Sequence, residues 1–600
     1  MQRLLRAAQA RNLDRIAVAY AVAGWILVQG ASIVFPAFDA PGWALRAFIV
    51  AVAMGFPATL TIAWFATPHA QTIDETPGGV SHREVVLLAL LGVVLLLSLG
   101  ELLFVFRRAS SAPAPAITAS AANKPAAASI AVLPFVNMSG DPAREIVSDG
   151  ISEELLNDLS NVAALRVAAR TSSFAFKGRN EDIKEIARVL GVRAILEGSI
   201  REDGEQIRIT AQLIDAADGF HLWSETYDRE MTGILALEDE IARAITSALT
   251  NKLLGTITIA PAGKPASIDP VAYRAYLEGQ HELGPRTEDG VAKAVALFRR
   301  VATLQPDFAD GFAALGRALI NEAEFNPGQK KLMPEAETAL ARALALDPDN
   351  VYALSAHLDL ALHGLDWPTA GIDAKRLNAI NPNSNPVLHE MFRYYQLLGF
   401  PDKALEAVRG AAKLDPLSFV DRYNIVAALI HNGQFAQAVD AAHEALALEP
   451  NQTEALAMLC TADAYSNRLT DANAVLLQLS QGGDETSRSR CMFDIEVAEG
   501  RFAEAQTMVD TLASQFPHGD FSAADIGESY ARSRNFDKAA LWFARAYDER
   551  DFALFTIAFT RSIPAEFFKT AGWEALLQRP LFRDWQGAHD KLAADLGVGH

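Results

Sequence analysis

The sequence predicts a multi-domain fold class with three parts: transmembrane helices, a small two-layer α/β domain and an all-α solenoid of helical repeats. Three observations lead to it. Long apolar runs lie within residues 16–106, and residues 130–254 alternate between strand-like and helix-like patterns. From residue 294 onwards, a small residue recurs with a period of about 34 residues.

The periodic residue is alanine, and it opens each unit of the C-terminal half. The eight positions are Ala294, Ala336, Ala370, Ala404, Ala438, Ala472, Ala505 and Ala539. Six of them are followed twelve residues later by a proline, at Pro306, Pro348, Pro382, Pro416, Pro450 and Pro517. Alanine lets two antiparallel helices approach closely, and proline ends a helix because it lacks an amide donor and clashes with the preceding turn. We expect glycine at the same helix crossings, at Gly399, Gly433 and Gly500.

This pattern resembles the tetratricopeptide repeat (TPR) and predicts an array of about eight repeats over residues 271–551. Residues 255–270 form a proline-containing linker before it. Residues 552–600 show no further match to the period, and we expect capping helices there that cover the last apolar face. A stack of such repeats leaves an extended concave surface on which a protein or peptide partner can bind.

The N-terminal part predicts three membrane-spanning helices at residues 16–38, 43–65 and 85–106, each long enough to cross a bilayer. Arginines in residues 1–15 favour a cytoplasmic N-terminus. Three crossings then place the later domains in the periplasm of a bacterial, multi-pass inner-membrane protein, with the lipid bilayer as one partner. Residues 107–129, rich in alanine, proline and serine, form a spacer.

Residues 130–254 predict the order strand, helix, strand, helix, three strands, helix. The clearest signal is a hairpin, in which apolar residues alternate with polar ones over 206–213 after the turn residues Asp203 and Gly204. The last helix carries Leu237, Ile241, Ile245 and Leu249 on one face. This order indicates a small two-layer α/β domain.

Several stretches of this domain resemble a known family. IAVLPFVNMSGDP (130–142), SDGISEEL (148–155), RTSSFAFKG (170–178), LGVRAILEGSIR (190–201) and RITAQLIDAADGFHLWSETYDRE (208–230) are similar to the TolB N-terminal-like or FlgO-like domain. The resemblance implies relation to bacterial membrane proteins that join adenylate cyclase or winged-helix modules to TPR arrays. Because about fifteen residues precede the first apolar run, we expect no cyclase or winged-helix module in this chain.

The composition bears on two questions: whether the protein binds nucleic acid, and whether its cysteines form a disulfide. The net charge of −20 argues against a nucleic-acid-binding surface, which needs a basic stripe over phosphates. The two cysteines, Cys460 and Cys491, lie about one repeat apart on neighbouring first helices. A disulfide between them is conceivable, but we favour two buried free thiols.

We found no catalytic motif. The sequence lacks a GxxxxGK[ST] phosphate loop, an HExxH zinc helix, a CxxC pair and a GxSxG nucleophile elbow. We therefore expect no enzyme activity, no cofactor and no metal ion.

The first helix of each repeat faces the concave side in such arrays, and the repeat register places eight residues there. They are Asp359, His389, Arg393, Gln396, Tyr423, Arg490, Asp494 and Glu528. Mixed charges and aromatic rings suit the capture of a peptide or protein. The alternative is that these residues only solvate a surface, and the sequence does not separate the two.

Two functions follow from this organisation. The first is a noncatalytic, membrane-anchored TPR protein that mediates protein–protein interaction or sensing in the bacterial cell envelope. The second is a receptor or signalling subunit of a cyclase-like or transcriptional system whose effector is separate or missing. The identity of the partner and the oligomeric state are not predicted.

Overall fold

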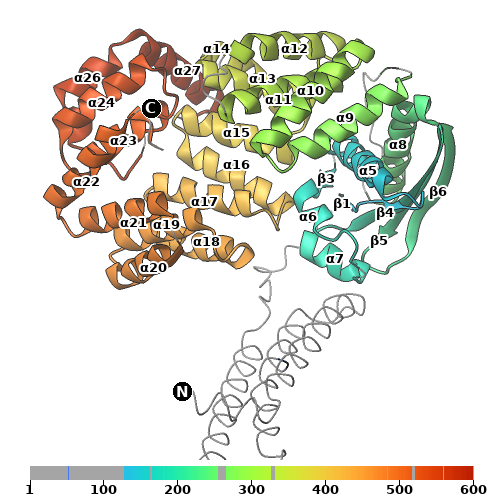
Figure 1. Ribbon diagram of the computed structural model, residues 1–600, viewed down its shortest axis with the longest axis horizontal. Helices are drawn as coiled ribbons and strands as arrows, with labels where there is room; N and C mark the ends of the chain where they lie inside the picture. Colours follow the sequence, from blue (N-terminus) through green and yellow to red (C-terminus); the bar gives the residue numbers. More distant parts are fainter. Residues whose placement is uncertain are drawn as a thin grey trace, which may run out of the picture. The chain divides into compact units, whose positions relative to one another are not determined.

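The computed structural model describes residue 52 and residues 128–598, apart from gaps at 163–164, 180, 254–264, 266, 326–330, 483, 517–520 and 558–559. Over this range the chain is a mostly helical, TPR-like solenoid with a small sheet domain (Figure 1).

The predicted fold class and localisation are corrected in one respect. Within the described residues, no helix combines the length and the apolar character needed to cross a bilayer. The membrane part of the fold class and the multi-pass inner-membrane localisation are therefore unsupported. Apart from residue 52, the three predicted spans, at 16–38, 43–65 and 85–106, lie outside the described residues.

The sheet domain begins with parallel strands. Its strands run in the order β3-β1-β4-β5-β6, and β2 also pairs with β4. Strand β1 (Ser129–Val132) is parallel to both β3 (Arg166–Val167) and β4 (Ala194–Asp203), and β2 (Val136–Asn137) is parallel to β4. All four residues of β1 are buried, as is typical of a strand covered on both faces.

The predicted hairpin is present. Strands β4 and β5 (Gln206–Asp215) are antiparallel with Asp203 opposite Gln206, so Gly204 and Glu205 form a two-residue turn. Gly204 has a φ of 64°, a conformation that glycine adopts without steric cost. Strand β6 (His221–Glu230) completes the antiparallel part and lies at one edge of the sheet.

Helices cover both faces of the parallel strands, which differs from the predicted two layers. Helices α5 (Glu145–Ser160) and α8 (Ile234–Leu253) share a core with Ile130 and Val132 of β1. The alternate residue, Ala131, packs in a separate core with α7 (Ile183–Leu190). A short helix, α6 (Arg170–Phe174), was not predicted.

The solenoid consists of antiparallel helix pairs. The pairs are α9 (Pro270–Leu283) with α10 (Glu288–Leu304), α11 (Ala309–Phe325) with α12 (Met333–Leu346), α13 (Val351–Gly364) with α14 (Trp367–Ile380), α15 (Asn385–Leu397) with α16 (Pro401–Leu414), α17 (Phe419–His431) with α18 (Phe435–Leu448), α19 (Thr453–Tyr465) with α20 (Leu469–Gly482), α21 (Glu485–Ala498) with α22 (Phe502–Gln515), and α23 (Ala523–Arg532) with α24 (Phe536–Asp548).

The periodic alanines lie in the second helix of each pair, and all eight are at most 1% exposed, which confirms their close-packing role. The predicted proline stop also holds, because α10, α12, α14, α16 and α18 each end two residues before a proline. The prediction that three glycines lie where the paired helices cross was wrong. Gly399, Gly433 and Gly500 lie in the turn inside each pair with φ of 79°, 67° and 75°, where the chain needs a left-handed residue.

One hydrophobic core joins the sheet domain to the first repeats. It runs from Ile130 in β1 through Leu155 in α5 to Tyr276 in α9 and Leu340 in α12. Helices α5 and α9 approach closely at Gly150, where a Cβ atom would lie 2.7 Å from a methyl carbon of Leu277. The α/β domain is thus packed directly on the start of the array.

The C-terminal helices pack at two places. Helix α26 (Ala571–Leu577) packs on α24, as expected for a cap. Helix α27 (Pro580–Leu596) contacts α24 at its start and also packs on α14 (Figure 1). The indole nitrogen of Trp585 donates a hydrogen bond of 2.9 Å to the carbonyl of Leu397 in α15. The end of the chain therefore contacts the middle of the array.

The two cysteines form a disulfide, which corrects the preference for free thiols. Cys460 in α19 and Cys491 in α21 are both fully buried, and their Cα atoms are 5.5 Å apart. The two cysteines face each other on adjacent first helices, at a Cα separation that a disulfide spans. This closeness depends on how α19 packs on α21, which the sequence pattern does not show.

We predict that Cys460→Ala lowers the free energy of unfolding by about 3–4 kcal/mol, because the bond closes a loop of 31 residues in the unfolded chain. Urea denaturation of the oxidised protein measures this loss. Wild type treated with dithiothreitol should match the variant, whereas thiols that react with Ellman's reagent in the unreduced, denatured wild type would contradict the pairing.

Candidate functional site

Three successive first helices place charged side chains against one another. Arg317 of α11 forms ion pairs with Asp359 of α13 at 2.8 Å and with Glu390 of α15 at 3.0 Å. Arg393 of α15 also pairs with Asp359. These side chains come from the same turn of stacked helices, so the repeat register itself brings them together.

Most of this charge is buried. The side chain of Asp359 is 2% exposed, that of Glu390 10% and that of Arg317 16%. Burial raises the pKa of Asp359, but Arg393, His363 and Arg317 outweigh that effect, and its pKa lies well below the ordinary value. Burial raises the pKa of Glu390 despite the nearby Arg317, so the negative charge on Glu390 is incompletely compensated.

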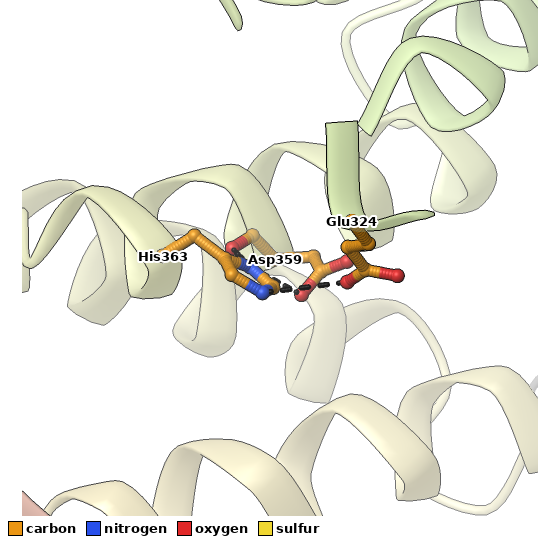
Figure 2. Close-up of side chains that lie close together, drawn as sticks. All are labelled: Glu324, Asp359 and His363. Atoms are coloured by element: carbon orange, nitrogen blue, oxygen red, sulfur yellow. Dashed lines mark hydrogen bonds and ion pairs between the residues drawn. The ribbon is translucent and has the colours of Figure 1, made fainter. Parts of the chain in front are cut away.

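The network extends to a histidine between two carboxylates. The Nε2 atom of His363 lies 3.3 Å from Glu324, and its Nδ1 atom lies 3.2 Å from Asp359 (Figure 2). Burial lowers the pKa of His363, but the hydrogen bond to Asp359 and the charge of Asp359 outweigh that effect, so the pKa is raised overall. A histidine that faces carboxylates with both nitrogens is stabilised as the imidazolium.

Glu324, Asp359 and His363 also have the donor types and spacing of a metal site. An imidazolium carries protons on both nitrogens and has no lone pair for a metal ion. The guanidinium groups of Arg317 and Arg393 already neutralise Asp359. We therefore interpret these three residues as part of an ion-pair network.

The network forms one wall of a cavity that we call the interdomain cleft, lined by residues of α5, α8, α9, α11, α13 and α15. Its volume is about 830 Å³. The lining contains ten carboxylates and four arginines, which gives the cleft a marked acidic excess. The carboxylates are Glu153, Glu154, Asp158, Asp239, Asp310, Glu324, Asp347, Asp349, Asp359 and Glu390.

Three of the eight residues predicted on the concave face line this cleft: Asp359, His389 and Arg393. His389 pairs with the buried Asp421 of α17 at 2.8 Å. Burial lowers the pKa of His389, but Asp421 outweighs that effect and the pKa is raised.

The other five lie elsewhere along the array. The amide of Gln396 is 3.0 Å from Nδ1 of His431. Burial raises the pKa of Tyr423, and the positive charge of Arg490 opposes that rise. Asp494 and Glu528 both pair with Arg532 of α23.

Arg532 is the centre of a second buried network. Its guanidinium donates a hydrogen bond of 2.6 Å to the hydroxyl of Tyr465 and stacks over the rings of Tyr465 and Phe493, each at 5.2 Å. Thr461 donates a hydrogen bond to Asp494. These side chains satisfy one another, so we assign this network a structural role.

Part of the concave face is covered by the chain itself. The covering stretch, which we call the return segment, comprises residues 550–557 and 560–562. Arg550 donates a hydrogen bond of 2.7 Å to the carbonyl of Gly364, and the ring of Phe552 lies 5.1 Å from that of His363. Further along, the amide of Arg561 bonds the carbonyl of His431 at 3.2 Å, and Ser562 bonds Glu528 at 3.1 Å.

The sequence-based interpretation missed Arg317, Glu324, His363 and Glu390, and it missed the return segment. Arg317 lies 42 residues before Asp359, so it falls outside a strict period of 34 although it occupies the equivalent turn. The sequence signal that could have revealed the return segment is the concentration of aromatic residues at 552–585, which is typical of a stretch that packs on several helices.

Comparisons with known proteins cover parts of the chain. Residues 126–244 match the model of a family described as HilA/YgeH-like transcriptional regulator, second domain. A relative from Rhizobium meliloti (strain 1021), named putative adenylate cyclase 3, is 42% identical over 191 residues, which are 32% of this chain and 32% of the relative. The chain thus spans about a third of the length of the curated relative it matches.

Solved structures show weaker similarity. YrrB, described as a TPR protein with an unusual peptide-binding site, is 14% identical with a TM-score of 0.26, over 32% of this chain and 95% of that chain. Pseudomonas aeruginosa PilF is 17% identical with a TM-score of 0.29, over 36% and 95%. TolB from Acinetobacter baumannii is 18% identical with a TM-score of 0.16, over 22% and 30%. Scores this low carry no argument about function.

We predict that Arg317→Met lowers the free energy of unfolding by about 3–5 kcal/mol, because it leaves the buried carboxylate of Glu390 without its ion-pair partner and removes one of the cations that pair with Asp359. Urea denaturation gives the value. The matched control is Arg299→Met, which breaks the exposed Arg299–Glu335 pair of the same 2.8 Å length and should cost about 0–1 kcal/mol. Equal losses in the two variants would mean that the network is not buried.

We also predict that the pair of His389 and Asp421 makes stability depend on pH. The pKa of His389 is raised in the folded state, so its contribution is full below the unfolded value of about 6.5 and is lost as pH rises through the folded value. The difference in unfolding free energy between wild type and His389→Gln should shrink from pH 6 to pH 9.

The control for the pH series is His443→Gln, at an exposed position of α18. It should follow wild type at every pH. A difference for His389→Gln that stays constant across the series would show that the pair does not titrate in this range.

Proposed function

We propose that this protein is a noncatalytic interaction or sensing protein that captures a protein or peptide partner through its TPR-like array. The observation that carries the proposal is the interdomain cleft, where charged residues of three first helices converge on a cavity of about 830 Å³. Cavities of this size bind small molecules or a few residues of a peptide. The side chains at its wall are paired in ways that build a rigid surface.

The cleft also limits where the partner binds. Between α13 and α23 the return segment contacts the concave face, whereas the faces of α11, α13 and α15 that turn toward α5 line the open cavity. We infer that the partner enters between the α/β domain and the first repeats. Asp359, His389 and Arg393 are then the predicted residues that face it.

A second function is favoured by the comparisons. The HilA/YgeH-like match over 126–244 and the relative named putative adenylate cyclase 3 both support a signalling role. In that case the chain is the receptor part of a cyclase-like or transcriptional system, and the partner is its effector. The array would perform the same binding step in either function.

The test is site-specific photo-crosslinking in the full chain. Benzoylphenylalanine at Asp349, an exposed residue that lines the cleft, should form a saturable crosslink to a partner protein. The same probe at Leu477 on α20, whose side chain is 64% exposed, should not. Equal crosslinking at both positions, or none at Asp349, would contradict the proposal. A cyclase or DNA-binding domain in the captured partner would identify the second function.

A further inference from the structure

Two buried polar groups on the wall of the interdomain cleft have no hydrogen-bond partner among the described residues. One is the hydroxyl of Ser355 in α13, whose residue is 3% exposed. The other is Oε2 of Glu390, a residue 7% exposed, whose second oxygen, Oε1, accepts from Arg317. Leaving such groups without a partner is unfavourable, because the hydrogen bonds that they make to water in the unfolded chain are not replaced. Both can accept a hydrogen bond from a donor placed in the cleft.

The charge at Glu390 favours a cationic donor. Arg317 is shared between Glu390 and Asp359, and Arg393, the other cation near Glu390, pairs with Asp359. The pKa of Glu390 remains raised by burial despite both, so the carboxylate is under-compensated. A further cation beside Glu390 would complete the charge compensation that these two guanidinium groups leave unfinished. Hydrogen bonds of this charge-assisted kind are about twice as strong as neutral ones.

The rim of the cleft has the same sign. Asp310, Asp347 and Asp349 lie close together. The amide of Asn350 bridges Asp310 at 2.7 Å and Asp347 at 3.3 Å, and the guanidinium of Arg376 lies 3.6 Å from Asp349. Burial raises the pKa of Asp347, and the charges of Asp310 and Asp349 raise it further. An anionic ligand would meet this repulsive field, whereas a cation would relieve it.

We propose that the interdomain cleft binds the guanidinium or ammonium group of an arginine or lysine side chain on a partner peptide, with Glu390 and Ser355 as acceptors. This inference deepens the proposed function and rests on it. The recognised group is a basic side chain, and the residues that bind it lie on α13 and α15. The peptide backbone would lie along the acidic rim toward α5.

Isothermal titration of the full chain tests this with two blocked pentapeptides, acetyl-Ala-Ala-Arg-Ala-Ala-amide and the same peptide with citrulline, which has the shape of arginine without its charge. The arginine peptide should bind at least about tenfold more tightly, in line with a charge-assisted hydrogen bond. Glu390→Gln should remove about that factor, and Ser355→Ala should remove a smaller one. The control Ser529→Ala on α23 should bind like wild type.

Equal affinities for the two peptides, or no binding of either, would overturn the inference. That comparison uses wild-type protein alone, so it decides even if Glu390→Gln fails to fold. Spermidine binding as tightly as the arginine peptide would assign the cleft to free polyamines and would also overturn it. If the Asp349 crosslink still forms while neither peptide binds, the inference fails and the proposed function stands.

Discussion

The close contact between α5 and α9 is the constraint on which the rest of the described structure depends. The hydroxyl of Tyr276 in α9 donates a hydrogen bond of 3.0 Å to Glu154 in α5, and Tyr273 donates one to Glu238 in α8. Burial raises the pKa of both tyrosines well above the ordinary value, so they stay neutral donors. With the α/β domain held in this way, its acidic face lies opposite the first helices and the two together enclose the cleft.

A second set of contacts fixes the α/β domain farther along the array. Ser172 in α6 donates to Asp415, which follows α16, and the amide of Asn381 donates a hydrogen bond of 2.6 Å to the carbonyl of Ser160. The domain therefore bridges the start of the array and the turns that follow α14 and α16. Two separated attachments hold the cleft at a defined width, so that its walls can present acceptors at fixed positions.

Local patterns predicted the elements well, whereas contacts between distant segments escaped prediction. The period of the alanines gave the helix pairs, and the alternation at 206–213 gave the hairpin, because each reports burial of one face of one element. The partnership of Arg317 with Asp359, the disulfide, the second layer at α7 and the return segment depend on how elements stack in space. Asp359, His389 and Arg393 could be predicted on the concave face because the repeat register alone places them there, and Arg317 was missed because the 42-residue step breaks that register.

The packing of α27 on α14 connects repeats that are not neighbours in the sequence. In an open repeat protein each unit touches only its neighbours, so the end units fray first and stability is a sum of local terms. Here Trp585 and Lys375, which pairs with Asp595 at 2.7 Å, connect the last helix to the centre. Opening any one repeat between α15 and α24 must strain that closure, so these repeats should exchange their amide hydrogens as one cooperative unit.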